Sequence, residues 1–162
     1  MFYETAAFGF TQSLESNWLL IKEEFNRLQQ DNSIPWKKEF LYNKGWDIFN
    51  LHSFGKKIEE NCRLCPETTK LVESISGITT AIFSSLAPGT HIIPHKGYIN
   101  TVLRCHLGLI VPTDCAIRVG HETKNWEEGK CLVFDDTLEH EVWNHGNIPR
   151  IILLIDFKKS SF

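Results

Sequence analysis

Short apolar segments separated by turn residues fill the second half of this chain, and they limit its fold more than any other feature. Six segments from Thr79 onward are rich in aliphatic, aromatic and β-branched residues, as strands are. They span residues 79–86, 99–111, 116–119, 130–134, 139–143 and 151–157. Turn residues such as Pro88-Gly89 separate them, and no helical pattern intervenes. Many short strands at roughly regular spacing indicate a mainly β protein, an antiparallel barrel or jelly roll.

The first half of the chain carries the helices that we expect to flank this β core. Residues 11–30 repeat apolar side chains at helical spacing, with charged residues on the other side, which predicts one long helix. Residues 40–42 and 46–51 have the pattern of short strands. Pro66 begins a short helix, and Gly77 follows its end.

Length and composition are those of an ordinary soluble globular protein. The chain has 162 residues, enough for one good core, with 42% hydrophobic and 23% charged residues. We therefore expect a single domain over residues 1–162. Its helical and irregular part, about 1–78, should pack on a jelly-roll core of about 79–158.

Charge and targeting features narrow the expected partners and compartment. The net charge of −3, without a basic run, argues against nucleic-acid binding. No apolar stretch is long enough to cross a bilayer, so we expect no integral membrane contact. The first residues lack the basic and long apolar regions of a secretion signal. Five scattered cysteines are typical of free thiols, and together these features favour the cytoplasm.

Strand periodicity divides residues 99–111 into two faces. The face that belongs in a core carries Leu103, Cys105, Leu107 and Leu109. The opposite face carries Val102, Arg104, His106 and Gly108. An arginine and an imidazole therefore point the same way from one strand. On an exposed face this arrangement would be unremarkable. It becomes informative because a second arginine is expected to be buried nearby.

Arg150 supplies that second arginine, at the mouth of a segment that is apolar on both faces. Such a strand is covered on both sides, and a charge there costs several kcal/mol to desolvate unless an anion meets it. A turn at His145-Gly146 predicts an antiparallel hairpin that brings Arg150 close to the level of His140. Both side chains can then converge with Arg104 and His106 on one cavity.

Histidines are concentrated in the same region, at positions 91, 95, 106, 121, 140 and 145. Neutral imidazoles bind first-row transition metals, and a guanidinium among apolar residues needs an anion. The pattern indicates a metal beside an acidic small molecule. Spacing alone does not choose His95 over His91, or His140 over His145, as a ligand.

Four motifs follow one another between about Phe83 and Asp156: PGTHIIPHKG, LRCHLGL, WEEGKCLVFDD, and EHEVWN followed by an arginine. Together they resemble the aspartyl/asparaginyl β-hydroxylase family. Looser similarity reaches back through LESNW, KGW and CPET. The resemblance implies an Fe(II)- and 2-oxoglutarate-dependent dioxygenase on a double-stranded β-helix, a cupin-like jelly-roll barrel.

For the metal, the resemblance implies that His95 and His140 bind iron. Most enzymes of this chemistry add a carboxylate two residues after the first histidine. Gly97 occupies that position here. The family itself shows this two-histidine arrangement, so Gly97 agrees with the resemblance and implies looser iron binding, with water able to fill the vacant position.

For the cosubstrate, the resemblance implies that Arg150 and Ser84 hold the far carboxylate of 2-oxoglutarate. Arg104 and His106 would be catalytic residues that face the iron-side carboxylate and the substrate. Trp46 matches an aromatic residue near the pocket. With O2 as the oxidant, this set would hydroxylate an unactivated C–H bond.

The substrate is less constrained by the resemblance. Members that act on peptide domains have an extra arginine two residues before the one matching Arg104, where this chain has Val102. A free amino acid or short peptide is the expected substrate, with a lipid acyl chain as an alternative. A non-catalytic jelly roll that binds metal or a small acid without turnover is the main rival. A zinc-dependent hydrolase is a third hypothesis, and the sequence argues against it because it contains no HExxH motif.

Overall fold

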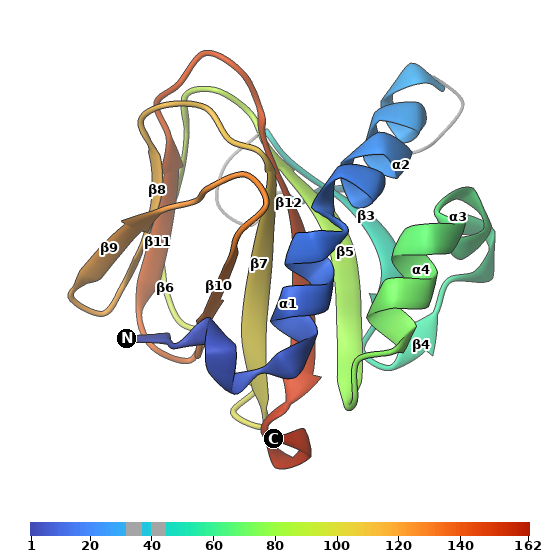
Figure 1. Ribbon diagram of the computed structural model, residues 1–162. Helices are drawn as coiled ribbons and strands as arrows, with labels where there is room; N and C mark the ends of the chain where they lie inside the picture. The colour runs from blue at the N-terminus through green and yellow to red at the C-terminus, as the bar shows by residue number, and fades with distance from the viewer. Residues whose placement is uncertain (32–36, 40–44) are drawn as a thin grey trace.

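Two antiparallel β-sheets form the centre of the molecule (Figure 1). The computed structural model describes residues 1–31 and 45–162, and the backbone of 37–39. The strands are β1 Phe2–Tyr3, β2 Lys37–Glu39, β3 Trp46–Ser53, β4 Lys56–Lys57, β5 Ile78–Leu86, β6 Thr90–His95, β7 Val102–Ile110, β8 Cys115–Val119, β9 Glu122–Asn125, β10 Cys131–Phe134, β11 His140–Asn144 and β12 Arg150–Lys158. The larger sheet runs β1-β10-β7-β12-β5-β3-β2, with β4 paired to β3, and the smaller sheet runs β6-β11-β8-β9. This is the jelly-roll architecture that the strand pattern predicts.

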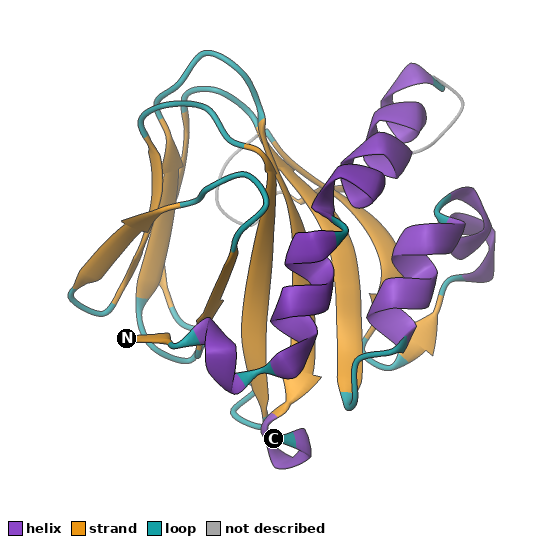
Figure 2. Cartoon of the chain, viewed as in Figure 1, coloured by secondary structure: helices purple, strands orange, loops and turns teal. Residues whose placement is uncertain are grey.

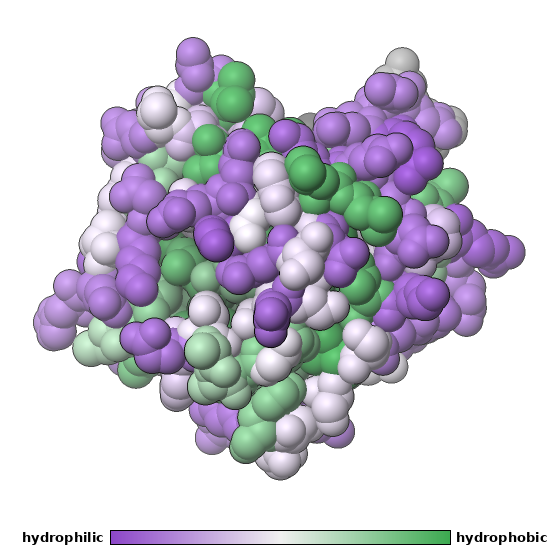
Figure 3. Space-filling view, viewed as in Figure 1, coloured by the Kyte–Doolittle hydropathy of each residue, from purple (hydrophilic) through white to green (hydrophobic). Residues whose placement is uncertain are grey.

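Helices cover one face of the larger sheet (Figure 2). They are α1 Gly9–Ser16, α2 Trp18–Gln30, α3 Glu59–Leu64 and α4 Pro66–Glu73, with 3-10 turns at Thr5–Ala7 and Lys159–Ser161. Helix α2 packs on β7, and α4 packs on β5. Hydrophilic side chains cover much of this face, with smaller hydrophobic groups among them (Figure 3). No helix in the described part of the chain is long and apolar enough to cross a bilayer.

Two apolar cores hold the three layers together. The core between the helices and the larger sheet includes Phe25 and Phe83. The core between the two sheets includes Ile117 and Phe134. Strand β12 serves both, because alternate residues belong to opposite cores. The prediction that this strand is covered on both faces is confirmed. Because each fully buried aliphatic or aromatic side chain adds about 1.5–3 kcal/mol to the free energy of unfolding, β12 is a central stabilising element.

The predicted division of β7 into two faces is also confirmed. Its apolar face lies in the helix-side core and carries Leu103, Cys105, Leu107 and Leu109. Arg104 and His106 point the other way and line a cavity between the sheets. The strand itself begins at Val102, three residues later than the pattern predicts.

The helix predicted over residues 11–30 is two helices. Asn17 separates α1 from α2, with φ −114° and ψ 14°. Its side-chain amide donates to the carbonyl oxygen of Ser13 at 2.7 Å, and its backbone N–H donates to that of Leu14 at 3.1 Å. An asparagine that hydrogen-bonds the preceding turn competes with helix continuation. The apolar periodicity continues across the break, so it does not reveal it.

The hairpin predicted around His145-Gly146 is wrong. Strand β11 pairs with β6 and β8 in the smaller sheet, whereas β12 pairs with β5 and β7 in the larger sheet. The chain therefore crosses from one sheet to the other. His140 and Arg150 still line the same cavity, because the two sheets face each other.

Some strands differ from the sequence-based expectation. Strands β1, β2, β4, β6 and β9 are additional to the predicted set. Strands β1 and β3 join the larger sheet, so the residues before Ile78 contribute strands as well as helices. The strand predicted at 40–42 lies outside the described residues.

A buried glutamate connects two of the helices. Glu24 of α2 is fully buried, and its Oε1 accepts hydrogen bonds from the backbone N–H and the hydroxyl of Thr68, both at 2.6 Å. Its Oε2 accepts from the N–H of Glu67 at 3.0 Å. These amides lie in the first turn of α4, where backbone donors have no partner within the helix.

Replacing Glu24 should therefore destabilise the fold. Glu24→Ala should lower the free energy of unfolding by about 2 to 3 kcal/mol, because buried donors lose their acceptor. Urea denaturation midpoints measure the effect. Glu23→Ala, exposed on the same helix, is the matched control and should change the midpoint little. Equal shifts in the two variants would contradict this role for Glu24.

Candidate functional site

A small cavity of about 40 Å³ between the two sheets brings the predicted site residues together. This inner cavity is lined by all seven of them: Trp46, Ser84, His95, Arg104, His106, His140 and Arg150. The larger sheet supplies five through β3, β5, β7 and β12, and the smaller sheet supplies the two histidines of β6 and β11. Residues from six strands thus meet at one place in the fold.

Two imidazoles form the smaller sheet's contribution. His95 and His140 are paired across β6 and β11, and their ring centres lie 4.2 Å apart. Nδ1 of His95 lies 2.9 Å from the carbonyl oxygen of Ile93, and Nδ1 of His140 lies 2.8 Å from that of Leu138. Because a carbonyl only accepts, each Nδ1 carries a proton, which leaves Nε2 as the nitrogen that can bind a metal. This is how backbone carbonyls orient metal-binding histidines.

The structure also separates the histidines that spacing left open. His91 lies on the outer side of the smaller sheet, with Nε2 2.8 Å from Oε2 of Glu141. His145 is exposed, with Nδ1 3.8 Å from Oδ2 of Asp114. Neither lines the inner cavity, whereas His95 and His140 do.

Asp136 occupies the space that a side chain at Gly97 would need. A Cβ atom on Gly97 would lie 2.4 Å from Oδ2 of Asp136, and the Gly97 N–H donates to the Asp136 carbonyl at 2.8 Å. Burial raises the pKa of the Asp136 carboxyl above its ordinary value, and the positive charge of the nearby Arg104 only partly offsets this rise. Within the described ranges, no three His, Cys, Asp or Glu side chains are placed to hold one metal ion. The histidine pair is the candidate metal site because its two rings lie side by side with their Nδ1 atoms held by backbone carbonyls.

Arg150 is the buried cation of the inner cavity, at 2% exposure. Its Nη2 donates to the Ser84 hydroxyl at 2.9 Å, and its guanidinium lies 4.6 Å from the centre of the Trp126 ring. Its buried Nε–H has no hydrogen-bond partner. Burial lowers the pKa of Arg150 to about 10, so the group stays charged at neutral pH. No carboxylate within the described ranges forms an ion pair with it, which leaves the charge available for an anionic ligand.

Ser84 adds a second donor beside Arg150. Its oxygen accepts from Nη2 of Arg150 and from the indole N–H of Trp46, both at 2.9 Å. A hydroxyl has two lone pairs and one proton, so these two bonds leave the proton for another acceptor. Trp46 therefore orients Ser84 toward the cavity, where its O–H and the Nε–H of Arg150 can meet one carboxylate.

His106 is held as a neutral donor. Burial, followed by the charges of Arg150 and Arg104, lowers its pKa well below the ordinary value. Its Nδ1 accepts from the indole N–H of Trp126 at 3.2 Å, so the proton of the neutral ring is on Nε2. That Nε2 is buried and has no partner. Trp126 begins the WEEGKCLVFDD motif, but strand periodicity gives it no role because it lies in the turn region before β10.

Arg104 is already paired within the protein. Its Nε and Nη2 donate to the two oxygens of Asp156, at 2.8 and 2.9 Å, and its Nη1 lies 3.4 Å from Oδ2 of Asp136. The protein itself therefore supplies the anionic partner of Arg104, the carboxylate of Asp156. Asp156 directly follows the run of apolar residues on β12, and nothing in the chain order connects it with Arg104. Their pairing follows from the β12–β7 register.

A larger pocket of about 370 Å³ continues from the inner cavity to the surface. The two share Trp46, His95, Arg104 and Leu154. This outer pocket also contains Asp136 and Asp156, and its rim includes the exposed side chains of Phe54 and Tyr98. A substrate in the outer pocket would lie beside the histidine pair.

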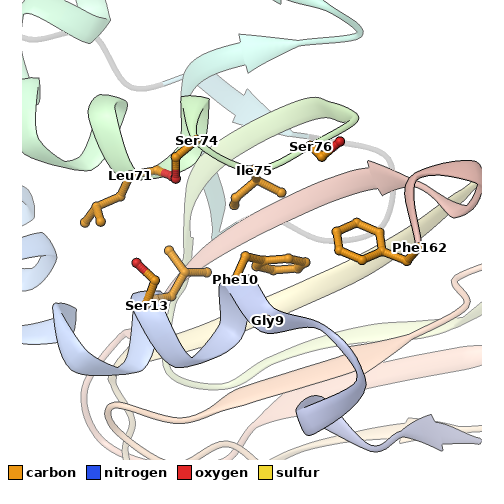
Figure 4. A pocket seen from close by; sticks show the side chains of 9 residues that line it. Gly9, Phe10, Ser13, Leu71, Ser74, Ile75, Ser76 and Phe162 are labelled. Atoms are coloured by element: carbon orange, nitrogen blue, oxygen red, sulfur yellow. The ribbon is translucent and has the colours of Figure 1, made fainter.

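A separate groove of about 280 Å³ lies between α1, α4 and the last residue (Figure 4). Phe10, Leu71, Ile75 and Phe162 line it, together with serines and Gly9. None of its lining side chains is titratable, so it lacks groups for acid–base or metal chemistry.

Comparison with known proteins assigns the family. Residues 15–160 match the family described as aspartyl/asparaginyl beta-hydroxylase. The chain belongs to this family. The aspartyl/asparaginyl beta-hydroxylase of Mus musculus is 41% identical over 94% of this chain and 22% of its own length. The ornithine lipid ester-linked acyl 2-hydroxylase of Rhizobium tropici is 40% identical over 97% of this chain and 60% of its own.

Solved structures support the fold of this aspartyl/asparaginyl beta-hydroxylase family member. A 2OG-Fe(II) oxygenase family oxidoreductase from Burkholderia pseudomallei superposes with a TM-score of 0.59 at 11% identity, covering 86% of this chain and 78% of that one. A predicted oxalate decarboxylase from Thermotoga maritima gives 0.53 at 14% identity, covering 77% and 93%. At these identities the likeness shows the jelly-roll fold alone.

The buried histidines should make the metal-free protein sensitive to acid. Burial lowers the pKa of His140 to about 4, from 6.5. Between these pH values the unfolded chain binds a proton that the folded chain does not, so the free energy of unfolding falls as the pH falls. The loss between pH 7 and pH 4 should be up to a few kcal/mol, and His106 acts in the same direction. Urea midpoints at pH 7 and 5 measure it. His140→Gln should flatten the dependence, and equal slopes would contradict the assignment.

Removing the indole N–H of Trp126 should release the tautomer of His106. Trp126→Phe keeps an aromatic ring beside Arg150 but loses the donor to Nδ1. Nitrogen NMR of labelled imidazoles should show His106 protonated on Nε2 in the parent protein and a mixture of tautomers in the variant. Trp143→Phe, on the outer side of β11, is the control and should leave the His106 signals unchanged.

Proposed function

We propose that this protein is an Fe(II)- and 2-oxoglutarate-dependent dioxygenase that hydroxylates an unactivated C–H bond. One observation carries the proposal: the buried Arg150 guanidinium, without a carboxylate partner in the described part of the chain, lines the same cavity as the paired imidazoles. A buried cation next to two metal-type ligands suits an anion that also binds the metal. Membership of a hydroxylase family supports the same chemistry.

His95 and His140 are the proposed iron ligands. Imidazole suits iron, and Nε2 atoms that share one first-row metal lie about 3 Å apart, which their ring separation of 4.2 Å allows. Bound Fe(II), together with 2-oxoglutarate and O2, supplies the oxidising chemistry. The carbonyls of Ile93 and Leu138 hold both rings in the metal-binding tautomer.

Arg150 and Ser84 are the proposed partners of the far carboxylate of 2-oxoglutarate. The Nε–H of Arg150 and the O–H of Ser84 are the donors that the protein leaves unused. At the iron side, the Nε2–H of neutral His106 and Nη1 of Arg104 are the proposed donors to the keto-acid carboxylate. Fixed donors in a dry cavity orient the cosubstrate without reorganisation during the reaction.

Two substrate classes fit this reaction, and each comes from the name of a relative. The first is an aspartyl or asparaginyl residue of a peptide, which we extend to a free amino acid. The second is the acyl chain of a lipid. All five cysteines are free and buried, which supports the reducing cytoplasm as the proposed compartment. A non-catalytic binding module remains the rival. It predicts ligand binding without turnover.

Succinate release separates the enzyme from the binding module. With Fe(II), 2-oxoglutarate and O2, the enzyme should release succinate slowly even without its substrate, and faster with it. Mass spectrometry of substrate candidates should show a gain of one oxygen atom. Binding of 2-oxoglutarate without succinate would favour the rival.

Loss of the Arg150 guanidinium should weaken 2-oxoglutarate binding. Arg150→Ala should lower the affinity by about 2 kcal/mol or more, the scale for truncating one partner of a buried charge pair. Arg150→Lys should recover only part, since an ammonium does not reproduce the planar fork. Calorimetry with Mn(II) in place of iron measures both. Arg63→Ala, an exposed arginine on α3, is the control. An unchanged affinity in Arg150→Ala would place the cosubstrate elsewhere.

Each proposed iron ligand should be individually necessary for tight metal binding. His95→Ala and His140→Ala should abolish stoichiometric Fe(II) binding while the circular dichroism spectrum stays unchanged. His91→Ala and His145→Ala remove histidines outside the cavity and should bind iron like the parent protein. Retained binding in His95→Ala or His140→Ala would remove that residue from the ligand set.

A further inference from the structure

A glycine on β7 marks the place where another part of the chain crosses this strand beside the site. Gly108 shares the cavity-facing side of β7 with His106, and its backbone φ is not positive. A Cβ atom on Gly108 would lie 2.3 Å from the carbonyl oxygen of Glu127 and 3.2 Å from Cγ2 of Val111. The first contact is with backbone, which cannot turn away as a flexible side chain can. Glycine is therefore needed here for close approach and not for an unusual conformation.

The crossing segment is residues 126–130, between β9 and β10 (Figure 1). Two backbone hydrogen bonds fasten it to Gly108. The N–H of Gly129 donates to the Gly108 carbonyl at 2.9 Å, and the Gly108 N–H donates to the Lys130 carbonyl at 3.1 Å. These bonds hold the crossing segment against β7 at a distance that leaves no room for a side chain at position 108.

The crossing segment begins with Trp126, which is buried beside two donors of the inner cavity. The Arg150 guanidinium lies 4.6 Å from the centre of the Trp126 ring. The indole N–H donates to Nδ1 of His106 at 3.2 Å, and the two rings are inclined by 27°. A cation over an aromatic face is attracted to it, most strongly over tryptophan. One side chain thus supports two donors that the proposed function assigns to opposite ends of 2-oxoglutarate.

We propose that Gly108 is a positioning residue for the cosubstrate, because its missing side chain seats Trp126 against both donors. A side chain at position 108 pushes the crossing segment away from β7, so Arg150 and His106 lose their common support together. The effect on 2-oxoglutarate rests on the proposed function. The seating of Trp126 does not, since it is a property of the protein without cosubstrate.

Gly108→Ala tests the seating in the metal-free full chain. Alanine is compatible with the strand backbone at this position, so the variant reports on the crossing segment. Nitrogen NMR should show His106 protonated on Nε2 in the parent protein and a mixture of tautomers in Gly108→Ala. Gly9→Ala is the matched control, because a Cβ atom there meets nothing within 4 Å, and it should leave the His106 signals unchanged. An unchanged His106 tautomer in folded Gly108→Ala would overturn the proposal.

The affinity for 2-oxoglutarate tests whether Gly108 acts through Trp126. Calorimetry with Mn(II) in place of iron should show a loss of about tenfold in Gly108→Ala and in Trp126→Leu, the scale of one cation–π contact. The double variant should bind about as well as either single variant, because changes that remove the same contact do not add. A loss of about a hundredfold in the double variant would show that the two positions act independently, which would refute the proposal.

Glu128 provides a variant that introduces no clash. Its Oε2 accepts from the backbone N–H of Val111 at 3.1 Å, so Glu128→Ala loosens the crossing segment at an exposed position. The 2-oxoglutarate affinity should fall about threefold, on the scale of one exposed hydrogen bond. Glu127→Ala removes the same charge from the same segment and is the control. If Gly108→Ala does not fold, this pair decides the question, and equal affinities in the two variants would contradict the proposal.

Failure of this proposal is distinguishable from failure of the proposed function. If the parent protein binds no 2-oxoglutarate and releases no succinate, the proposed function fails, and the His106 tautomer in metal-free Gly108→Ala still decides the seating of Trp126. If the parent protein binds 2-oxoglutarate and Gly108→Ala binds it equally well, the proposed function stands and the positioning role of Gly108 is refuted.

Discussion

A buried guanidinium supported only by neutral groups is the constraint on which the site depends. Arg150 is surrounded by a serine hydroxyl, an indole face and aliphatic side chains. None of these neutral groups offsets the charge of the guanidinium, so the cavity stays positively charged. A bound anion would compensate this charge. The other polar atoms of the cavity are arranged around this charge. Ser84 and His106 are both left with a proton to donate, and both owe this to an indole N–H that occupies their acceptor side.

The two halves of the site are held together by packing, not by chain connectivity. The imidazole pair belongs to the smaller sheet and Arg150 to the larger one, and no pairing between the described strands links the two sheets. Their separation is set by the core between the sheets, where Ile92 and Val142 of the smaller sheet meet Ile152 of the larger. Changes in that core would alter the spacing between the paired imidazoles and the Arg150 guanidinium before they unfolded the protein.

Much of this arrangement could be predicted from local pattern. Period-two alternation identified both faces of β7, and the doubly apolar run identified β12 as a covered strand. What the sequence did not reveal depends on partners brought together by tertiary register. The ion pair of Arg104 with Asp156, and the hydrogen bond from Trp126 to His106, join residues with no shared periodicity. The crossing between sheets after β11 likewise depends on packing, since a tight turn between two strand-like segments normally predicts a hairpin.

The close fit of Gly97 against Asp136 restricts how such a site can change over evolutionary time. A mutation that introduced an acid at 97 would bring its Cβ within 2.4 Å of an existing carboxylate oxygen and place two like charges together. That single step would be harmful in any background that retains Asp136. An acid at position 97 therefore becomes sterically possible only after position 136 has changed, so the order of these two mutations, and not only their final combination, decides whether the pair can be reached.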